Sequence, residues 1–285
     1  MLSLDGIIFG LQRSGGISVY FRELAKRCFK ANLPARLRIY GNENPIFLEE
    51  PWEEEKLYRS PISIPSVARF LSAKVDKEAS VFHSSYYRIT KSVGVRSVTT
   101  VHDFTHENGA LTGARSRALI SLKRKAISKS DAIISISQAT TNELLERFPN
   151  IQGRHVVTIY NGVSDEFNRP ARAFSARPIY VVFVGSRAHY KGFELAVKAV
   201  SLLASVDGWL YVIGGGALSS SERSLLNKNI GGRFRAMPHI DTPSLADLLS
   251  QAVALVYPSE YEGFGLPPIE AMRASCPPIV RNTSC

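Results

Sequence analysis

Short, continuous apolar runs rich in β-branched residues recur along this 285-residue chain, and they constrain its fold more than any other feature. The runs are residues 98–101, 132–136, 156–159, 180–184, 210–213 and 254–257. Runs without polar alternation are typical of parallel strands that are buried on both faces. Amphipathic helical patterns lie between them, at residues 16–30, 114–129, 140–148, 193–203 and 244–251. This alternation predicts an α/β fold with parallel sheets.

Two stretches interrupt the alternation. Residues 168–178 are rich in Pro, Arg and Ala and carry no buried-strand pattern, so we place a domain boundary there. The first domain is then residues 1–168 and the second residues 178–285. Residues 43–66 combine six glutamates, five of them clustered at positions 49–55, with four prolines, which suits neither a strand nor a long helix. We expect that segment to be an exposed excursion from the first domain.

Composition narrows the class of protein. The net charge of +10 and the isoelectric point near 9.6 favour an anionic partner, namely a membrane surface, a nucleic acid or a phosphorylated substrate. Cys28, Cys276 and Cys285 are too scattered for a disulfide framework or a zinc site. No window reaches the roughly 18 apolar residues that span a bilayer, and the start lacks the order of a signal peptide. We therefore expect a cytoplasmic protein.

Ligands of parallel α/β sheets bind beyond the carboxyl ends of the strands, where helix N-termini offer free amides. The first junction with suitable residues is the segment 12–18, in which Gly15 and Gly16 directly precede a helix. The two glycines would let backbone amides approach a phosphate or a sugar closely. A plain tight turn explains the same residues.

The second junction is the segment 184–192, which closes a buried strand and contains Ser186, Arg187 and Lys191. Two cations four residues apart can clamp a diphosphate. The alternative is a solvated loop that carries ordinary surface charges.

The third junction follows the strand at 254–257 and reads Glu262-Gly263-Phe264-Gly265-Leu266-Pro267-Pro268-Ile269-Glu270. Proline is well tolerated in a first helical turn, so a helix begins near Pro267. Glu262 then lies in a glycine loop and Glu270 one turn into the helix, where one carboxylate can hold sugar hydroxyls and the other a ribose. Alternatively, Glu262 is a plain loop carboxylate and Glu270 a first-turn acid stabilised by the helix dipole.

Two histidines, His102 and His106, follow the strand at 98–101. A histidine at a strand end can bind a ligand or transfer a proton, but a structural histidine with its hydrogen bonds satisfied is an alternative for His102. A metal site would need Asp103 and Glu107 as well, and no further cluster with recognisable ligand spacing accompanies them.

Motifs that are typical of other enzyme classes are absent from the sequence. The chain has neither a P-loop nor a nucleophile elbow, and Gly214-Gly215-Gly216 lacks dinucleotide-binding spacing, so we interpret it as a flexible loop. The helix at 114–129 carries six basic residues and no acid. It can rest on anionic lipid headgroups, or it can pack on the core with a solvated basic face. Specific nucleic-acid binding is not expected, because no motif for it is present.

Together these residues resemble retaining glycosyltransferase family 4, in the bacterial branch that builds O-antigen and other surface polysaccharides. The resemblance extends over nearly the whole chain, and its most specific part is the pair Glu262 and Glu270 in the context Tyr257 to Gly265. The other matching segments are residues 9–18, 82–87, 100–103, 136–140 and 159–164. The resemblance implies a GT-B fold, in which two Rossmann-like parallel-sheet domains face a cleft.

The resemblance also implies a reaction and its residues. A sugar would move with retention from a nucleoside-diphosphate sugar to a saccharide or lipid-linked acceptor, without a metal or another cofactor. In the family pattern Gly16 and its neighbours close over the donor, Arg187 and Lys191 bind the diphosphate, and Glu270 binds the ribose. The implied catalytic residues are His102, on the transferred sugar, and Glu262, on its hydroxyls. The implied donor-binding residues are Gly15, Gly16, Ser186, Arg187, Lys191, Gly263, Phe264, Gly265, Leu266 and Glu270.

One departure concerns length. The family continues well beyond its second glutamate, whereas fifteen residues follow Glu270 here, including one expected strand at 278–280. We therefore expect an incomplete second domain. The competing hypothesis is a non-catalytic remnant that binds nucleotide or is unstable. A peripheral position at the inner face of the cytoplasmic membrane is a further expectation.

Overall fold

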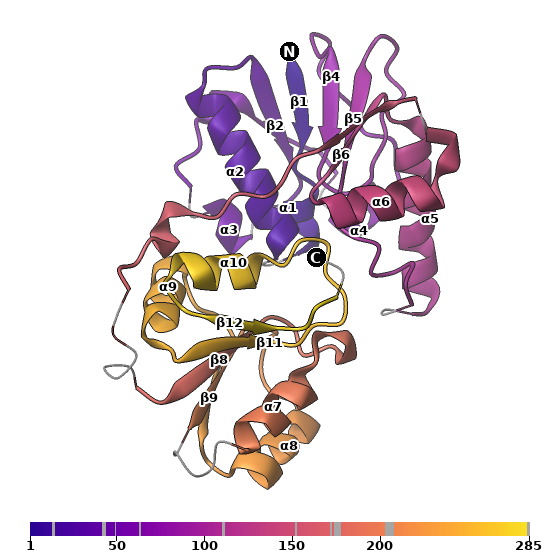
Figure 1. Cartoon of the computed structure of the whole chain (residues 1–285). Coiled ribbons are helices and arrows are strands. Elements are labelled where there is room, and N and C mark those ends of the chain that lie inside the picture. Colours follow the sequence, from indigo (N-terminus) through magenta and orange to yellow (C-terminus); the bar gives the residue numbers. More distant parts are fainter. Residues whose placement is uncertain are drawn as a thin grey trace. The chain divides into compact units, whose positions relative to one another are not determined.

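The computed structural model contains two compact units, residues 1–161 and residues 162–285 (Figure 1). It describes residues 1–12, 15–41, 44–48, 50–62, 64–109, 112–151, 153–171, 173, 178–202 and 208–283. Each unit is built on one parallel sheet with helices between its strands. The predicted α/β class is therefore confirmed.

The first unit contains a seven-stranded parallel sheet in the order β3-β2-β1-β4-β5-β6-β7. In register, Leu4 lies opposite Leu37 on one side and His83 on the other. The strands are β1 (Leu2–Asp5), β2 (Ala35–Ile39), β3 (Leu57–Arg59), β4 (Val81–Ser84), β5 (Arg96–Val101), β6 (Ala132–Ser135) and β7 (His155–Thr158).

The helices of this unit cover the sheet with apolar faces. In α2 (Gly16–Lys30), Phe21, Ala25 and Phe29 recur every four residues and are buried. The hydroxyl of Ser137 caps α6 by accepting from the amide of Thr140. The other helices are α1 (Ile8–Leu11), α3 (Pro45–Leu48), α4 (Pro65–Ala68), α5 (Ala114–Lys129) and α6 (Gln138–Arg147), with short 3-10 turns η1 (Glu54–Lys56) and η2 (Pro149–Ile151).

The expectation that residues 43–66 form an exposed excursion is only partly correct, because Leu48 and Ile64 are exposed but the segment also belongs to the sheet and the core. This segment supplies β3, the edge strand that pairs with β2, and Phe47 is only 6% exposed in the core. The prolines do not prevent this, because Pro45 and Pro65 stand at the first positions of α3 and α4, where a missing amide hydrogen costs nothing.

The second unit contains a five-stranded parallel sheet in the order β10-β9-β8-β11-β12. Its strands are β8 (Tyr180–Val184), β9 (Trp209–Ile213), β10 (Phe234–Met237), β11 (Ala254–Tyr257) and β12 (Pro278–Val280). Val182 and Leu255 belong to the core on one face, and Phe183 and Val256 to the core on the other. Burial on both faces explains why these strands read as continuous apolar runs.

Four helices join these strands. Ser219 and Glu222 form a capping box at the start of α8, and Asp241 caps α9. The helices are α7 (Phe193–Ser201), α8 (Ser220–Ile230), α9 (Thr242–Gln251) and α10 (Leu266–Arg273). The strand expected at residues 278–280 is present as β12, so the sheet extends past α10. Both units are Rossmann-like parallel-sheet domains.

The segment that leads into the second unit packs on that unit. The 3-10 turn η3 (Asp165–Phe167) places Phe167 in its core at 2% exposure. Arg169 pairs with Asp247 at 2.6 Å. The boundary predicted at residues 168–178 includes residues 172 and 174–177, which lie outside the described residues, and it stays a prediction.

Two further expectations concern thiols and membranes. Cys28 and Cys276 are buried free thiols, and Cys285 lies outside the described residues. Among the helices that the structure describes, none combines the length and the apolar character needed to cross a bilayer.

Candidate functional site

Two loops meet at the carboxyl ends of neighbouring strands in the second unit. Residues 185–192 follow β8, residues 258–265 follow β11, and the two strands pair directly. The amide of Glu260 donates to the carbonyl of Tyr190 at 2.7 Å. Gly192 adopts a left-handed φ of +70°, and a Cβ there would lie 2.6 Å from the Pro258 carbonyl oxygen. The close approach that this glycine permits locks the two predicted loops together.

This packing brings Lys191 and Glu262 into contact. Lys191 lies at the end of a 3-10 turn, η5 (His189–Lys191), and its Nζ is 2.5 Å from Glu262 Oε1. The hydroxyl of Tyr257, the last residue of β11, donates to the same carboxylate oxygen at 2.6 Å. Tyr257 was not among the predicted site residues. Its position at the strand end, five residues before Glu262, is the signal that could have found it.

Arg187 lies elsewhere in the same unit, against the glycine loop 214–217. Its Nε donates to Glu222 Oε1 at 2.8 Å and its Nη1 to the Gly214 carbonyl at 2.7 Å. Its Nη2 donates to the three following carbonyls at 2.9–3.2 Å. The side chain is only 4% exposed, so the alternative of a solvated surface charge is wrong for Arg187. Ser186, beside it, is exposed.

The loop Gly214-Gly215-Gly216, interpreted from the sequence as flexible, makes specific contacts with Arg187. All three residues have positive φ, from +71° to +81°, which only glycine adopts without strain. Their carbonyls therefore converge on the Arg187 guanidinium, whose planar fork of donors fits several acceptors at once. The loop is held by one buried cation.

Glu270 lies partly buried in α10. The helix begins at Leu266 after Gly265, which caps it with a φ of +76°, and its first turn contains no acid. Burial raises the pKa of Glu270 from 4.5 to about 7. The alternative of a first-turn acid stabilised by the helix dipole is therefore wrong. Gly263 in the preceding loop is buried, and Phe264 and Leu266 are partly buried.

In the first unit, His102 follows β5 and is 7% exposed. Its ring packs edge-on against Tyr20, with the ring centroids 5.2 Å apart. Burial lowers the pKa of His102 to about 4, which leaves a neutral imidazole at pH 7. Its Nε2 atom is buried and has no hydrogen-bond partner. His102 is therefore not a structural histidine with all its hydrogen bonds satisfied.

Tyr20 connects His102 with the predicted glycine pair, because it lies one turn into α2, whose first residue is Gly16. A Cβ at Gly16 would have nothing within 4 Å, whereas one at Gly15 would meet the side chain of Gln12 at 2.7 Å. Gly16 thus borders open space. Residues 13 and 14 of the predicted junction lie outside the described residues.

The side chains that the alternative metal site would need make contacts with other residues. The Nδ1 of His106 lies 2.8 Å from the Ser116 hydroxyl, and Glu107 pairs with Lys123 at 2.8 Å. Across the described ranges, no group of three or more His, Cys, Asp or Glu side chains could hold a metal ion. Independence from metal stays a prediction about the reaction.

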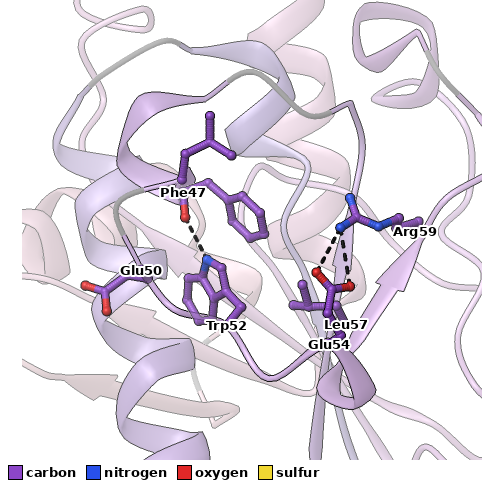
Figure 2. Close-up of a pocket in the computed structure, with 7 residues that line it drawn as sticks. Phe47, Glu50, Trp52, Glu54, Leu57 and Arg59 are labelled. Carbon is purple, nitrogen blue, oxygen red and sulfur yellow. Dashed lines mark hydrogen bonds and ion pairs between the residues drawn. The ribbon is translucent and has the colours of Figure 1, made fainter.

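A pocket of about 300 Å³ lies near β3 in the first unit (Figure 2). Its polar groups are already paired, with Glu54 accepting from Arg59 at 3.1 Å and the Trp52 indole donating to the Phe47 carbonyl at 2.7 Å. None of the predicted site residues lines it.

Family models match both units. The model for Glycosyltransferase Family 4 matches residues 14–167, and the model for Glycosyl transferases group 1 matches residues 164–285. The first match alone covers more than half of the chain. The two matches meet close to the division between the compact units.

Curated relatives agree with these matches. The chain is 29% identical over 198 residues to a glycogen synthase of Mycobacterium tuberculosis, covering 66% of this chain and 47% of that protein. It is 25% identical over 189 residues to an O-antigen chain mannosyltransferase of Salmonella typhimurium, covering 64% and 51%. The chain thus spans about half the length of these relatives.

Solved structures share the fold. A sucrose-phosphate synthase of Thermosynechococcus elongatus superposes with a TM-score of 0.72 at 17% identity, over 99% of this chain and 81% of that one. The Anabaena protein HepE, in complex with UDP-glucose, superposes with a TM-score of 0.66 at 14% identity, over 100% and 81%. With both units matched by family models, the chain belongs to glycosyltransferase family 4 and has the GT-B fold.

Proposed function

We propose that this chain transfers a sugar from a nucleoside-diphosphate sugar to a saccharide or lipid-linked acceptor, with retention of anomeric configuration. The observation that carries the proposal is the contact between Lys191 and Glu262 at the ends of adjacent strands. In the proposal, Lys191 is the cation for the donor phosphates and Glu262, beside it, is the carboxylate for sugar hydroxyls. The complex of HepE with UDP-glucose supports a nucleotide sugar as the donor class.

In the proposed reaction the bond between the sugar C1 and the diphosphate oxygen breaks, and a bond from C1 to the acceptor oxygen forms on the same face. The diphosphate leaves with the bonding electron pair, and its oxygen takes the proton that the acceptor hydroxyl loses. Lys191 exchanges its contact with Glu262 for the donor phosphate, and Arg187 adds a second cation at the loop after β8. Positive charge at this position stabilises the negative charge that develops on the leaving group.

Glu270 is proposed to accept hydrogen bonds from the ribose of the donor. Its partly buried carboxyl has a pKa that desolvation raises to about 7, and ribose hydroxyls would supply the donors that an ionised carboxylate needs there. The loop 263–266, which leads into α10, is proposed to lie along the donor, and so is Ser186.

His102 is proposed to contact the transferred sugar from the first unit. As a neutral imidazole it can accept or donate one hydrogen bond through Nε2, the atom that has no partner. Gly15 and Gly16, at the start of α2, are proposed to close over the donor, because space beside Gly16 is open. No metal or other cofactor is required.

Synthesis of a surface polysaccharide such as O-antigen is the proposed setting, in line with the mannosyltransferase relative. A peripheral position at the inner face of the cytoplasmic membrane is proposed through α5. This helix exposes a basic face, to which anionic headgroups are attracted. The exposed cations are Arg115, Arg117, Arg124, Lys125 and Lys129. Lys123 does not belong to this face, contrary to its expected surface position, because it is 2% exposed.

Turnover tests the proposal. The purified chain is incubated with UDP-glucose, UDP-N-acetylglucosamine or GDP-mannose, and release of the nucleoside diphosphate is measured with and without saccharide acceptors. We expect turnover with at least one donor and its loss in Arg187→Ala and Glu262→Ala variants that remain folded. Unchanged turnover in both variants would show that the assigned roles are wrong. Nucleotide binding without turnover would favour the non-catalytic alternative.

A further inference from the structure

Lys123 of α5 is a cation buried in the first unit, with only 2% of its side chain exposed. Its Nζ donates to the backbone carbonyl of Asp103 at 2.8 Å and to Glu107 Oε2 at 2.8 Å. It also lies 5.0 Å and 5.3 Å from the ring centroids of Phe104 and Tyr87. Lysine is almost never fully buried unless it is paired, so this ammonium is a specific structural element.

The partners of Lys123 belong to the segment that begins at His102. Asp103 directly follows the histidine, and Glu107 lies one turn further on, so a single ammonium holds both ends of the segment 103–107. A second contact between the same elements joins His106 to Ser116 of α5 at 2.8 Å. The segment that carries His102 is thus fastened to α5 at three points.

Tyr87 holds the backbone on the N-terminal side of His102. The backbone amide of His102 donates to the Tyr87 hydroxyl. Tyr87 follows β4, the strand next to β5, and has a positive φ of 56°, which is rare for a bulky residue. Such backbone strain persists where the surrounding structure enforces it, and it is concentrated at functional sites. Tyr87 therefore holds the peptide that precedes His102, and Lys123 holds the carbonyl of the next residue, Asp103.

We propose that Lys123 and Tyr87 are positioning residues, which fix the backbone at His102 and so orient its imidazole toward the transferred sugar. The role in turnover rests on the proposed function. The contacts explain why a basic residue is buried in a helix whose other cations are exposed. Small displacements of a positioned group are costly, and a shift of about 1 Å can lower a rate about 100-fold.

Two variants of the full chain test this proposal. Tyr87→Phe removes only the hydroxyl that accepts from His102. The double variant Lys123→Met, Glu107→Met removes both buried charges together, which leaves neither one unpaired and so preserves folding better than a single replacement. Lys30→Met is the matched control, because Lys30 is an exposed lysine at the end of α2. Thermal unfolding is recorded for every variant.

Two readouts are used. With the nucleotide sugar that wild type turns over, we expect kcat to fall about 10-fold or more in both variants while the donor KM stays within about twofold. The second readout is the ring resonance of His102 in chain labelled at its six histidines, assigned with a His102→Gln variant. We expect it to shift in both variants and to stay in place in Lys30→Met.

The outcomes separate the two proposals. Wild-type kcat with an unmoved His102 resonance in folded Tyr87→Phe and double variants would overturn the positioning role. A moved resonance with wild-type kcat would also overturn it, because the imidazole would then be displaced without consequence. Absence of turnover by wild type with every donor would refute the proposed function, and the resonance would then decide on the positioning of His102 alone.

Discussion

Replacing Glu270 by glutamine should change the stability of the second unit in a pH-dependent way. Burial raises the pKa of this carboxyl from 4.5 to about 7, so the fold favours its protonated form. The stability that protonation contributes is fully present below pH 4.5 and is lost as the pH rises through 7. Glutamine has nearly the same shape and cannot ionise.

The magnitude follows from the shift. A difference of about 2.5 pKa units corresponds to about 3 kcal/mol in the free energy of unfolding. Wild type loses this stability between pH 4.5 and pH 8, whereas Glu270→Gln does not. For a unit the size of residues 162–285, that free energy corresponds to about 10 °C in the midpoint of thermal unfolding. The variant should match wild type near pH 4.5 and exceed it by up to this amount at pH 8.

The assay is thermal unfolding at several pH values between 4.5 and 8.5. Glu194→Gln is the matched control, because Glu194 is an exposed glutamate in α7 of the same unit. We expect its unfolding midpoint to follow wild type throughout. If Glu270→Gln and wild type differed by the same amount at every pH, the inferred burial of an ionisable carboxyl would be refuted.

Three further predictions concern the same unit. Gly192→Ala should lower the free energy of unfolding by at least about 2 kcal/mol, as measured by chemical denaturation. The reason is that a Cβ at this left-handed φ would lie 2.6 Å from the Pro258 carbonyl oxygen. Tyr257→Phe removes a hydroxyl that donates to Glu262, so turnover should fall about 10-fold while stability falls by about 1 kcal/mol. Binding of UDP at pH 7 should release about half a proton from Glu270, which calorimetry in buffers of different ionisation enthalpy detects.

Much of the fold is predictable from the sequence because strands buried on both faces need continuous apolar runs. The predicted runs at residues 180–184 and 254–257 are β8 and β11 with the same bounds. The edge strand β3 was missed, because an edge strand of three residues among glutamates and prolines has no such run. Its pairing with β2 depends on tertiary contacts that local sequence does not encode.

The sequence predicts only which residues of the candidate site lie at strand ends. Side chains that follow adjacent parallel strands can be expected to meet, and Lys191 and Glu262 do so. Which partner a long side chain chooses depends on the packing around it. Arg187 was expected beside Lys191 and instead holds the glycine loop after β9, the strand on the other side of β8.

Lys123 shows the same limit in the first unit. In the sequence it is one of six basic residues in a helix without acids, so its burial cannot be told from that pattern. Its partners, the Asp103 carbonyl and Glu107, lie 20 and 16 residues earlier, and only the fold brings them to the ammonium.

Titration of nucleoside diphosphates tests the central claim, that the second unit holds the donor of a glycosyl transfer. UDP, GDP and dTDP are titrated calorimetrically into the full chain and into Lys191→Met. We predict saturable binding of at least one of them at one site per chain, and at least about 10-fold weaker binding by the variant, because a charge-assisted contact with the diphosphate is lost. Absence of binding by all three, or equal binding by Lys191→Met, would contradict the claim.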